Sequence, residues 1–191
     1  MQYRRAFLPG GTFFFTVVTV DRRPLFAEQE NVATLREAFR TIRLQRPFRL
    51  DAAVVLPDHL HCIWTLPPGD ADFATRWRLI KTWVTKHYAL NGSSGYAALT
   101  RPTASGSNVD EMTASKRQQT VWQHRYWEHM LRDETDYRRH VEYIHFNPVK
   151  HGYVKGPIDW PYSSFHQHVK EGLYSPDWGS GLPDFDGVGQ E

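Results

Sequence analysis

Two adjacent segments of alternating residues constrain the fold of this chain more than any other feature. In the first, residues 48–56, apolar side chains occupy every second position: Phe48, Leu50, Ala52, Val54 and Leu56. In the second, residues 58–66, alternation separates a face with two histidines from a fully apolar face. The first face carries His59, His61, Ile63 and Thr65, and the other carries Leu60, Cys62, Trp64 and Leu66. Because so few residues separate the two segments, we expect them to pair as an antiparallel hairpin.

The patterns on either side of this hairpin complete a mixed fold. Residues 12–20 are rich in β-branched and aromatic side chains, which is typical of a buried strand. Residues 121–131 predict a fourth strand. Helical spacing of apolar residues predicts three helices, with stripes at Val32, Leu35, Phe39 and Ile42, at Phe73, Trp77, Ile80, Val84 and His87, and at Tyr137, Val141 and Ile144.

We expect the first of these helices to end before Pro47 and the last to end at Asn147–Pro148. The order of elements predicts an α+β fold, a ferredoxin-like or RRM-like βαββαβ sheet with helices on one face. A further C-terminal helix and an extended tail follow. In that topology the first and third strands are central, so the histidine strand lies in the middle of the sheet.

Length and composition limit the possible classes. A chain of 191 residues favours one domain, and we take residues 1–170 as that domain and 171–191 as an acidic tail. The single cysteine, Cys62, excludes an internal disulfide framework and suits a reducing compartment. The longest apolar-leaning run, residues 12–20, is about half of a membrane span. We therefore expect a soluble, cytoplasmic protein with no membrane partner.

The distribution of charge favours a polyanion partner, and ordinary surface patterning for solubility is the alternative explanation. No acidic residue lies between Asp72 and Asp110, whereas the tail from Glu171 carries five acidic residues and no basic one. The whole chain has a net charge of +2, so a tail at −5 leaves residues 1–170 at +7. Residues 91–119, rich in Gly, Ser, Thr and Ala, predict a long flexible loop.

Two groups of polar residues are candidates for a reaction site. His59 and His61, side by side on one strand face, have the arrangement of half a metal site, although ten histidines would give about half an H-x-H by chance. Tyr143 and Asn147 are four residues apart and share a helix face, and His140 lies one turn earlier. Taken singly, Tyr143 could also be a half-buried core aromatic, and Asn147 before Pro148 could be a helix terminator.

Several blocks together resemble the REP-associated tyrosine transposases, a branch of the single-tyrosine HUH transposases. The blocks are TFFFT at 12–16, LPDHLHCIW at 56–64, WQ at 122–123, WEH at 127–129 and YIHFNPVKHG at 143–152. The resemblance covers about residues 3–178, apart from the 91–119 loop.

The resemblance implies a metal-dependent nuclease and strand transferase that acts on single-stranded DNA with a REP-type hairpin. By matching motifs, His59 and His61 would be metal ligands, Asn147 would complete the metal site, and Tyr143 on the catalytic helix would be the nucleophile. The expected product is a covalent 5′-phosphotyrosine intermediate, and the expected cofactor is a divalent ion, Mg²⁺ or Mn²⁺. His140 is a candidate for assisting Tyr143, and the protein could act as a monomer or a homodimer.

The candidate DNA contacts are basic and aromatic. Possible phosphate contacts are Arg4, Arg5, Arg22, Arg23, Arg76, Arg78, Lys81 and Lys150, and Trp160 or Tyr162 could stack on bases. Two other functions remain open from the sequence. One is a non-catalytic module that binds hairpins or single-stranded nucleic acid on an RRM-like sheet. The other is a small zinc hydrolase, which would need a third His, Asp or Glu ligand beside His59 and His61.

Overall fold

The computed structural model describes residues 8–91 and 121–179. The predicted loop at 91–119 lies outside these residues except for its first position, as do Arg4, Arg5 and the last part of the acidic tail. The strands are β1 (Thr12–Val18), β2 (Arg49–Val55), β3 (His59–Thr65) and β4 (Trp127–Met130). The helices are α1 (Gln29–Gln45), α2 (Phe73–Asn91), α4 (Glu134–Lys150) and α5 (Phe165–Lys170), with short 3₁₀ turns at Val20–Arg22, Leu25–Ala27 and Pro157–Asp159.

The strands form one antiparallel sheet in the order β2-β3-β1-β4. The predicted mixed α+β fold is therefore confirmed, and so are the β2–β3 hairpin and the central places of β1 and β3. His61 pairs with Thr16 of β1 on one side and with Val54 of β2 on the other. A histidine held between two neighbouring strands has little freedom of backbone position, which is what a precisely built site requires.

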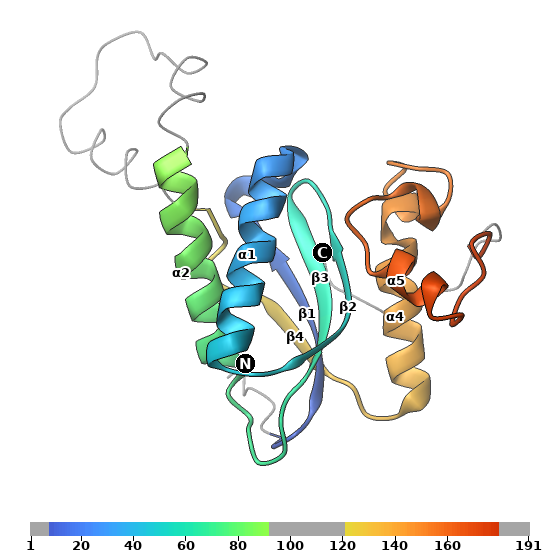
Figure 1. Cartoon of the computed structure of the whole chain (residues 1–191), viewed down its shortest axis with the longest axis horizontal. Helices are drawn as coiled ribbons and strands as arrows, with labels where there is room; N and C mark the ends of the chain where they lie inside the picture. The colour runs from blue at the N-terminus through green and yellow to red at the C-terminus, as the bar shows by residue number, and fades with distance from the viewer. Residues whose placement is uncertain (1–7, 92–120, 180–191) are drawn as a thin grey trace, which may run out of the picture.

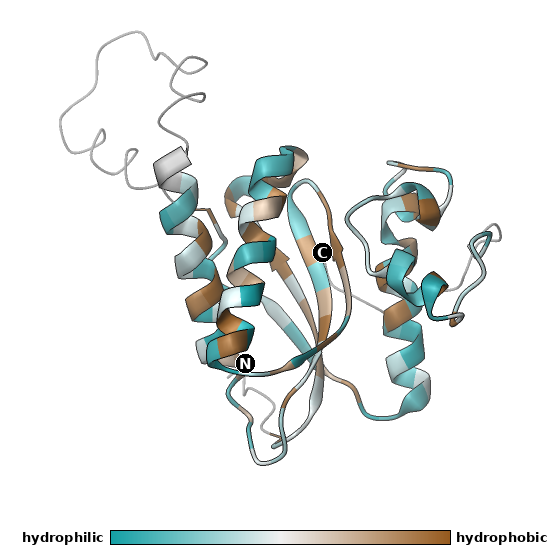
Figure 2. Cartoon of the chain, in the orientation of Figure 1, coloured by the Kyte–Doolittle hydropathy of each residue, from teal (hydrophilic) through white to brown (hydrophobic). Residues whose placement is uncertain are grey.

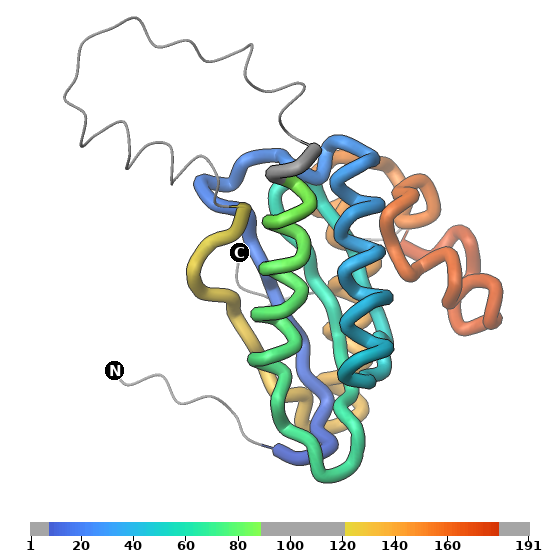
Figure 3. The backbone as a smooth tube through the Cα atoms, turned by 60° about the vertical axis from the view of Figure 1, so that its left-hand side comes forward, coloured from blue at the N-terminus to red at the C-terminus, as the bar shows by residue number. Residues whose placement is uncertain are grey.

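One face of the sheet carries the main hydrophobic core. Helices α1 and α2 lie side by side on this face (Figures 1 and 3), where their buried stripes meet Leu60, Cys62 and Trp64 of β3. The Trp64 and Trp77 rings stack at 4.4 Å, which joins the centre of the sheet to α2. Both predicted helical stripes point into this core, apart from His87, which is only half-buried.

Helix α4 covers the opposite face of the sheet (Figure 1). Val141, Tyr143 and Ile144 pack there against Phe14 of β1 and Ile63 of β3. Hydrophobic residues run along the central strands and the helices on both sides (Figure 2). The sheet thus lies between two apolar layers, and the histidine face of β3 is the one that looks toward α4.

Strand β2 does not keep one alternating face, contrary to the sequence prediction. A shift of register between Leu50 and Ala52 marks a β-bulge at Asp51. Because an extra residue reverses the side-chain alternation, Phe48 and Leu50 pack under α1, whereas Ala52 and Val54 pack under α4. The bulge lets one strand contribute to both cores.

Two predicted boundaries are also wrong. The fourth strand is confined to Trp127–Met130, and Trp122 makes only an isolated bridge to Thr19, because exposed residues bend the chain between them. Helix α4 continues through Pro148 to Lys150. A proline removes one helical hydrogen bond, but this one lies in the last turn, where the His151 and Tyr153 amides still donate to the Asn147 and Pro148 carbonyls.

Candidate active site on the face of β3 toward α4

His59 and His61 are buried on the central strand, with exposed fractions of 1% and 0%. Their rings lie 4.9 Å apart. The Nδ1 atom of His61 shares a hydrogen bond with the Thr16 hydroxyl at 2.9 Å, and the Nδ1 atom of His59 shares one with the Asp58 carboxylate at 2.6 Å. Both rings are therefore fixed through Nδ1, so Nε2 is the nitrogen that each would offer to a ligand.

A second layer of charge supports His59. The Arg22 guanidinium donates to Asp58 at 3.1 Å. Burial alone would raise the pKa of Asp58, but the hydrogen bonds and positive charges of His59 and Arg22 outweigh it, so this pKa lies below its ordinary value. Asp21 and Arg22 both have positive φ angles, 53° and 49°, which non-glycine residues adopt at a cost. The turn that presents Arg22 to Asp58 is thus held in an unusual conformation next to the site.

Tyr143 projects from α4 toward these histidines. It is 1% exposed, and its ring meets that of His61 edge to face at 5.2 Å. Asn147 is fully buried one turn further along the same helix face, and Lys150 follows one turn later. The Lys150 ammonium lies 4.9 Å from the centre of the Tyr143 ring and 3.4 Å from its hydroxyl oxygen. The continuation of α4 through Pro148 is what brings this cation onto the Tyr143 face.

The N-terminal end of α4 is fixed to β4 by a polar network. Asp133 caps the helix by accepting from the Asp136 amide. The Asp136 carboxylate accepts from Arg132 at 3.0 Å and shares a hydrogen bond with His129 at 3.0 Å. Burial would raise the pKa of Asp136, but these partners lower it to about 2. Asp136 is thus a charged anchor of the helix that carries Tyr143.

His140 belongs to this anchor and not to the pair of Tyr143 and His61. Its ring stacks on His129 at 4.9 Å, and its Nδ1 lies 2.8 Å from the Asp136 carbonyl oxygen. The Phe14 ring, which contacts both His140 and His61, lies between them in the sheet. This placement does not support the predicted assisting role. Burial, above all, lowers the pKa of His140, which favours its neutral form.

The cluster of His129, Asp136 and His140 could itself hold a metal, and it is the one group of three His, Cys, Asp or Glu side chains in residues 8–91 and 121–179 with that geometry. The Asp136 carboxylate and the Nδ1 atom of His140 already have protein partners. Arg132 neutralises the Asp136 carboxylate, and the Nδ1 atom of His140 bonds to the backbone. We therefore interpret it as a structural network.

A third histidine, His151, lies at the site, and the sequence analysis did not name it as a candidate. The His151 ring lies 5.3 Å from the His59 ring, just past the end of α4. Gly152, with a φ of +71°, provides the left-handed residue that commonly ends a helix. In the sequence, the block KHG at 150–152 indicates that the chain turns here, but it does not indicate which way the His151 ring points.

His145 lies in the same motif as Tyr143 but serves the core. It is fully buried, and its Nε2 shares a hydrogen bond with the Ser164 hydroxyl at 3.1 Å. Burial, with the nearby His168, lowers the pKa of His145 to about 3, so it stays neutral at physiological pH. Its ring packs on Phe165 and thereby connects α5 to α4.

The donor set suits a divalent metal ion. Two imidazoles fixed through Nδ1 and a buried amide one helix turn beyond Tyr143 are ligand types found in metal sites that bind phosphate. The chemistry of these side chains therefore fits the cofactor that the sequence resemblance implies.

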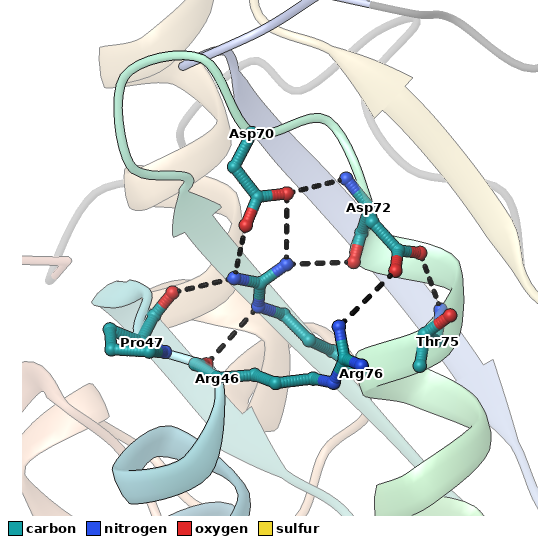
Figure 4. A network of polar contacts seen from close by, with 6 residues as sticks. All are labelled: Arg46, Pro47, Asp70, Asp72, Thr75 and Arg76. Carbon is teal, nitrogen blue, oxygen red and sulfur yellow. Dashed lines mark hydrogen bonds and ion pairs between the residues drawn. The ribbon is translucent and has the colours of Figure 1, made fainter.

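Arg76 is not a DNA contact, contrary to the sequence prediction. It is 2% exposed, and its guanidinium forms an ion pair with Asp70 at 2.6 Å. The same group donates to the carbonyl oxygens of Arg46, Pro47 and Asp72 (Figure 4). Its role is to join the end of α1 to the start of α2. Asp70 and Asp72 lie close before it in the sequence, but the burial of Arg76 also depends on Arg46 and Pro47, which come from a distant segment.

The other predicted contacts fall into separate regions. Arg78 and Lys81 lie on α2, on the far side of the sheet from Tyr143. Lys81 donates to the Gln123 carbonyl at 2.9 Å, and burial lowers its pKa to about 8. Arg22 and Lys150 are exposed beside the histidine and tyrosine site, whereas Arg23 is half-buried.

Within the described residues, no helix is both long and apolar enough to cross a membrane.

Known proteins resemble the whole of this chain. A REP-associated tyrosine transposase of Escherichia coli K12 is 43% identical over 96% of the chain and 94% of its own length. A putative REP-associated tyrosine transposase of Haemophilus influenzae is 37% identical, with 96% and 95% covered.

Among solved structures, a REP-associated tyrosine transposase bound to a REP hairpin superposes with a TM-score of 0.77 at 41% identity, covering 100% of this chain and 98% of that one. No family model matches the sequence. Full-length identity at this level, together with the shared fold, shows that the chain belongs to the REP-associated tyrosine transposases.

Proposed function

We propose that this protein cleaves and rejoins single-stranded DNA next to REP-like hairpins, with Tyr143 as the nucleophile. The observation that carries the proposal is the edge-to-face packing of the Tyr143 ring on His61, which brings a hydroxyl-bearing helix against a pair of fixed imidazoles. The relative solved with a REP hairpin supports the choice of DNA.

The reaction would be a transesterification. The Tyr143 oxygen forms a bond to phosphorus while the bond from phosphorus to the 3′ oxygen breaks. The phenol proton passes to solvent, and the departing oxygen gains a proton to become a 3′-OH. The 5′ phosphate stays on Tyr143 as an ester, so a later attack by a 3′-OH rejoins DNA without a nucleotide cofactor.

His59, His61 and Asn147 would hold a divalent ion, Mg²⁺ or Mn²⁺. When bound, such an ion supplies positive charge to phosphate oxygens as negative charge accumulates in the reaction. Thr16 and Asp58 hold the two rings through Nδ1, so the protein fixes the ligand geometry before DNA arrives.

Lys150 would act at the nucleophile itself. Its ammonium lies 3.4 Å from the Tyr143 oxygen, where a fixed positive charge orients the hydroxyl and stabilises negative charge on the attacking oxygen. Hydrogen bonds at reacting groups are often long before substrate binds and shorten in the complex. Lys150, first predicted as a phosphate contact, is therefore assigned to Tyr143.

The test is a covalent adduct assay with the full chain, a single-stranded REP-like hairpin and Mn²⁺ or Mg²⁺. We expect an adduct that resists denaturation in wild type, none in Tyr143→Phe, and an unchanged amount in the control Tyr137→Phe, which alters another tyrosine of α4. Chelation of the metal should also abolish the adduct. An adduct of equal yield in Tyr143→Phe would refute the assignment, and hairpin binding without any adduct in wild type would favour a non-catalytic binding module.

A further inference from the structure

A groove lies along α1 on the far side of β2 from the candidate site. It has a volume of about 670 Å³ and combines aromatic, aliphatic and arginine side chains from α1, β2 and the 162–164 segment. Arg36, Arg40 and Arg43 line it and are exposed, at spacings of four and three that place them along one side of the helix. Leu44 beside them is 81% exposed, an unusual position for a large apolar side chain.

Two of these arginines are held over aromatic rings. The Arg36 guanidinium lies 5.5 Å from the centre of the Tyr162 ring, and that of Arg43 lies 5.7 Å from the centre of the Phe48 ring. Arg40 forms an ion pair with Glu37 at 2.9 Å. Alternating cations and aromatic faces are what proteins use to bind an unpaired nucleic-acid strand, since cations hold phosphates and rings stack on bases.

A series of ring contacts connects this groove to the candidate metal ligands. His59 contacts His151 at 5.3 Å, His151 contacts Tyr153 at 5.9 Å, and Tyr153 contacts Trp160 at 5.5 Å. Trp160 then contacts Tyr162 at 6.0 Å. Tyr153 is 46% exposed, so the series reaches the surface between its ends.

The backbone explains why the series passes around the sheet. The Trp160 indole donates to the Val55 carbonyl at 2.9 Å, and the Val55 amide donates to the Tyr162 carbonyl at 2.9 Å. Trp160 packs with the core under α4, whereas Tyr162 packs with the core under α1. Residues 160–162 therefore cross the edge strand β2 and join the two faces.

We propose that this surface, formed by Arg36, Arg40, Arg43, Tyr153, Trp160 and Tyr162, binds an unpaired DNA segment continuous with the strand at Tyr143. Its bases stack on the exposed Tyr153 ring and on the half-buried rings of Trp160 and Tyr162, and its phosphates pair with the arginines of α1. The surface explains how the protein could hold DNA beyond the scissile phosphate on a chain whose Arg76, Arg78 and Lys81 are turned away from the site. The inference rests on the proposed role of Tyr143, because that role fixes where the strand begins.

The experiment measures binding by fluorescence anisotropy with the full chain and two probes, a REP-like hairpin with a ten-nucleotide unpaired flank and the same hairpin without it. Tyr153→Ala should weaken binding of the flanked probe about 10-fold or more, with little effect on the blunt probe. The double variant Arg36→Gln with Arg40→Gln should lower the slope of log K against log salt by about 1.4 for the flanked probe. The control, Arg138→Gln with Lys170→Gln, removes two exposed charges elsewhere and should change neither value.

Thermal unfolding of each variant shows whether the fold is kept. Unchanged affinity and slope for the flanked probe would overturn the proposal. Equal losses for both probes would also overturn it, because the surface would then hold the duplex stem. The proposed function is tested separately by the adduct assay, and it fails if Tyr143→Phe still forms the covalent adduct. The anisotropy measurements can be interpreted whichever result the adduct assay gives.

Discussion

Replacing Lys150 with methionine tests whether the positive charge beside the Tyr143 oxygen contributes to the proposed reaction. Methionine keeps much of the side-chain length and the packing on the Tyr143 ring but removes the charge that lies 3.4 Å from the tyrosine oxygen. At that separation, two full charges interact by about 1.2 kcal/mol in water and about 5 kcal/mol at an effective dielectric constant of 20. Lys150 is exposed and the attacking oxygen carries only part of a charge, so we expect a loss of about 1 to 2 kcal/mol, or about 5- to 30-fold in rate.

The assay is single-turnover cleavage at saturating DNA, with the dissociation constant measured separately. The cleavage rate should fall in Lys150→Met and recover in part in Lys150→Arg, which keeps a cation near the ring. Lys155→Met is a matched control, because Lys155 is an exposed lysine five residues later, past the end of α4. A variant that binds DNA more weakly but cleaves at the wild-type rate when saturated would show that Lys150 holds only a phosphate.

Three further perturbations test the supports of the site. Arg76→Met should lower the free energy of unfolding by about 2 to 4 kcal/mol in urea denaturation, because it removes the buried guanidinium that joins Asp70 to the carbonyl groups of Arg46 and Pro47. Arg78→Met on the exposed side of α2 should change this free energy by less than about 0.5 kcal/mol, and similar small effects of both substitutions would contradict the buried network. Thr16→Val should weaken metal binding about 10-fold or more, because it releases the His61 ring. The loss would be seen as a higher Mn²⁺ concentration for the half-maximal cleavage rate, and an unchanged metal titration would exclude the orienting role of Thr16. The pKa of Asp136 is about 2 in the folded protein, below its value in the unfolded chain. Its contribution of about 1 to 2 kcal/mol to the free energy of unfolding is therefore present above pH 4 and is lost as the pH falls toward 2. Asp136→Asn should flatten this part of the stability profile in urea denaturation, and an equal pH dependence in both proteins would count against the anchor.

The fold could be predicted from the sequence where the local spacing of apolar residues determines the structure. The alternation at 58–66 separated the side chains of β3 that face α4 from those that face α1 and α2, and a register slip of one residue would put the histidines under α1. The order of elements then gave the central place of β3. The spacing of four between Tyr143 and Asn147 likewise gave their common helix face.

Features that depend on tertiary partners were not predictable in this way. The bulge at Asp51 reverses a strand face without interrupting the apolar alternation. The extension of α4 through Pro148 depends on the amides that follow it, and without that extension Lys150 would not lie beside Tyr143. Arg76 was predicted as a phosphate contact because its burial depends on the Arg46 and Pro47 carbonyls, which come from a segment far away in the sequence.

His151 illustrates the same limit in the site itself. Its position after α4 was visible in the sequence, but its contact with the His59 ring depends on how the chain turns at Gly152 and on how α4 lies across the sheet. The amino-acid sequence shows which residue types occur at motif spacing. The partners that orient those residues come from strands and loops far away in the sequence.

The central claim is that Tyr143 takes the 5′ phosphate of cleaved DNA. The most direct measurement is to trap the protein with a single-stranded REP-like hairpin and Mn²⁺, digest both components, and locate the nucleotide adduct by peptide mass spectrometry. If Tyr143 is the nucleophile, the mass of a nucleotide joined through a phosphodiester will be found on the peptide that contains Tyr143 and on no other tyrosine peptide. A nucleotide attached to a different residue, or cleavage of the hairpin with no attached nucleotide, would contradict it.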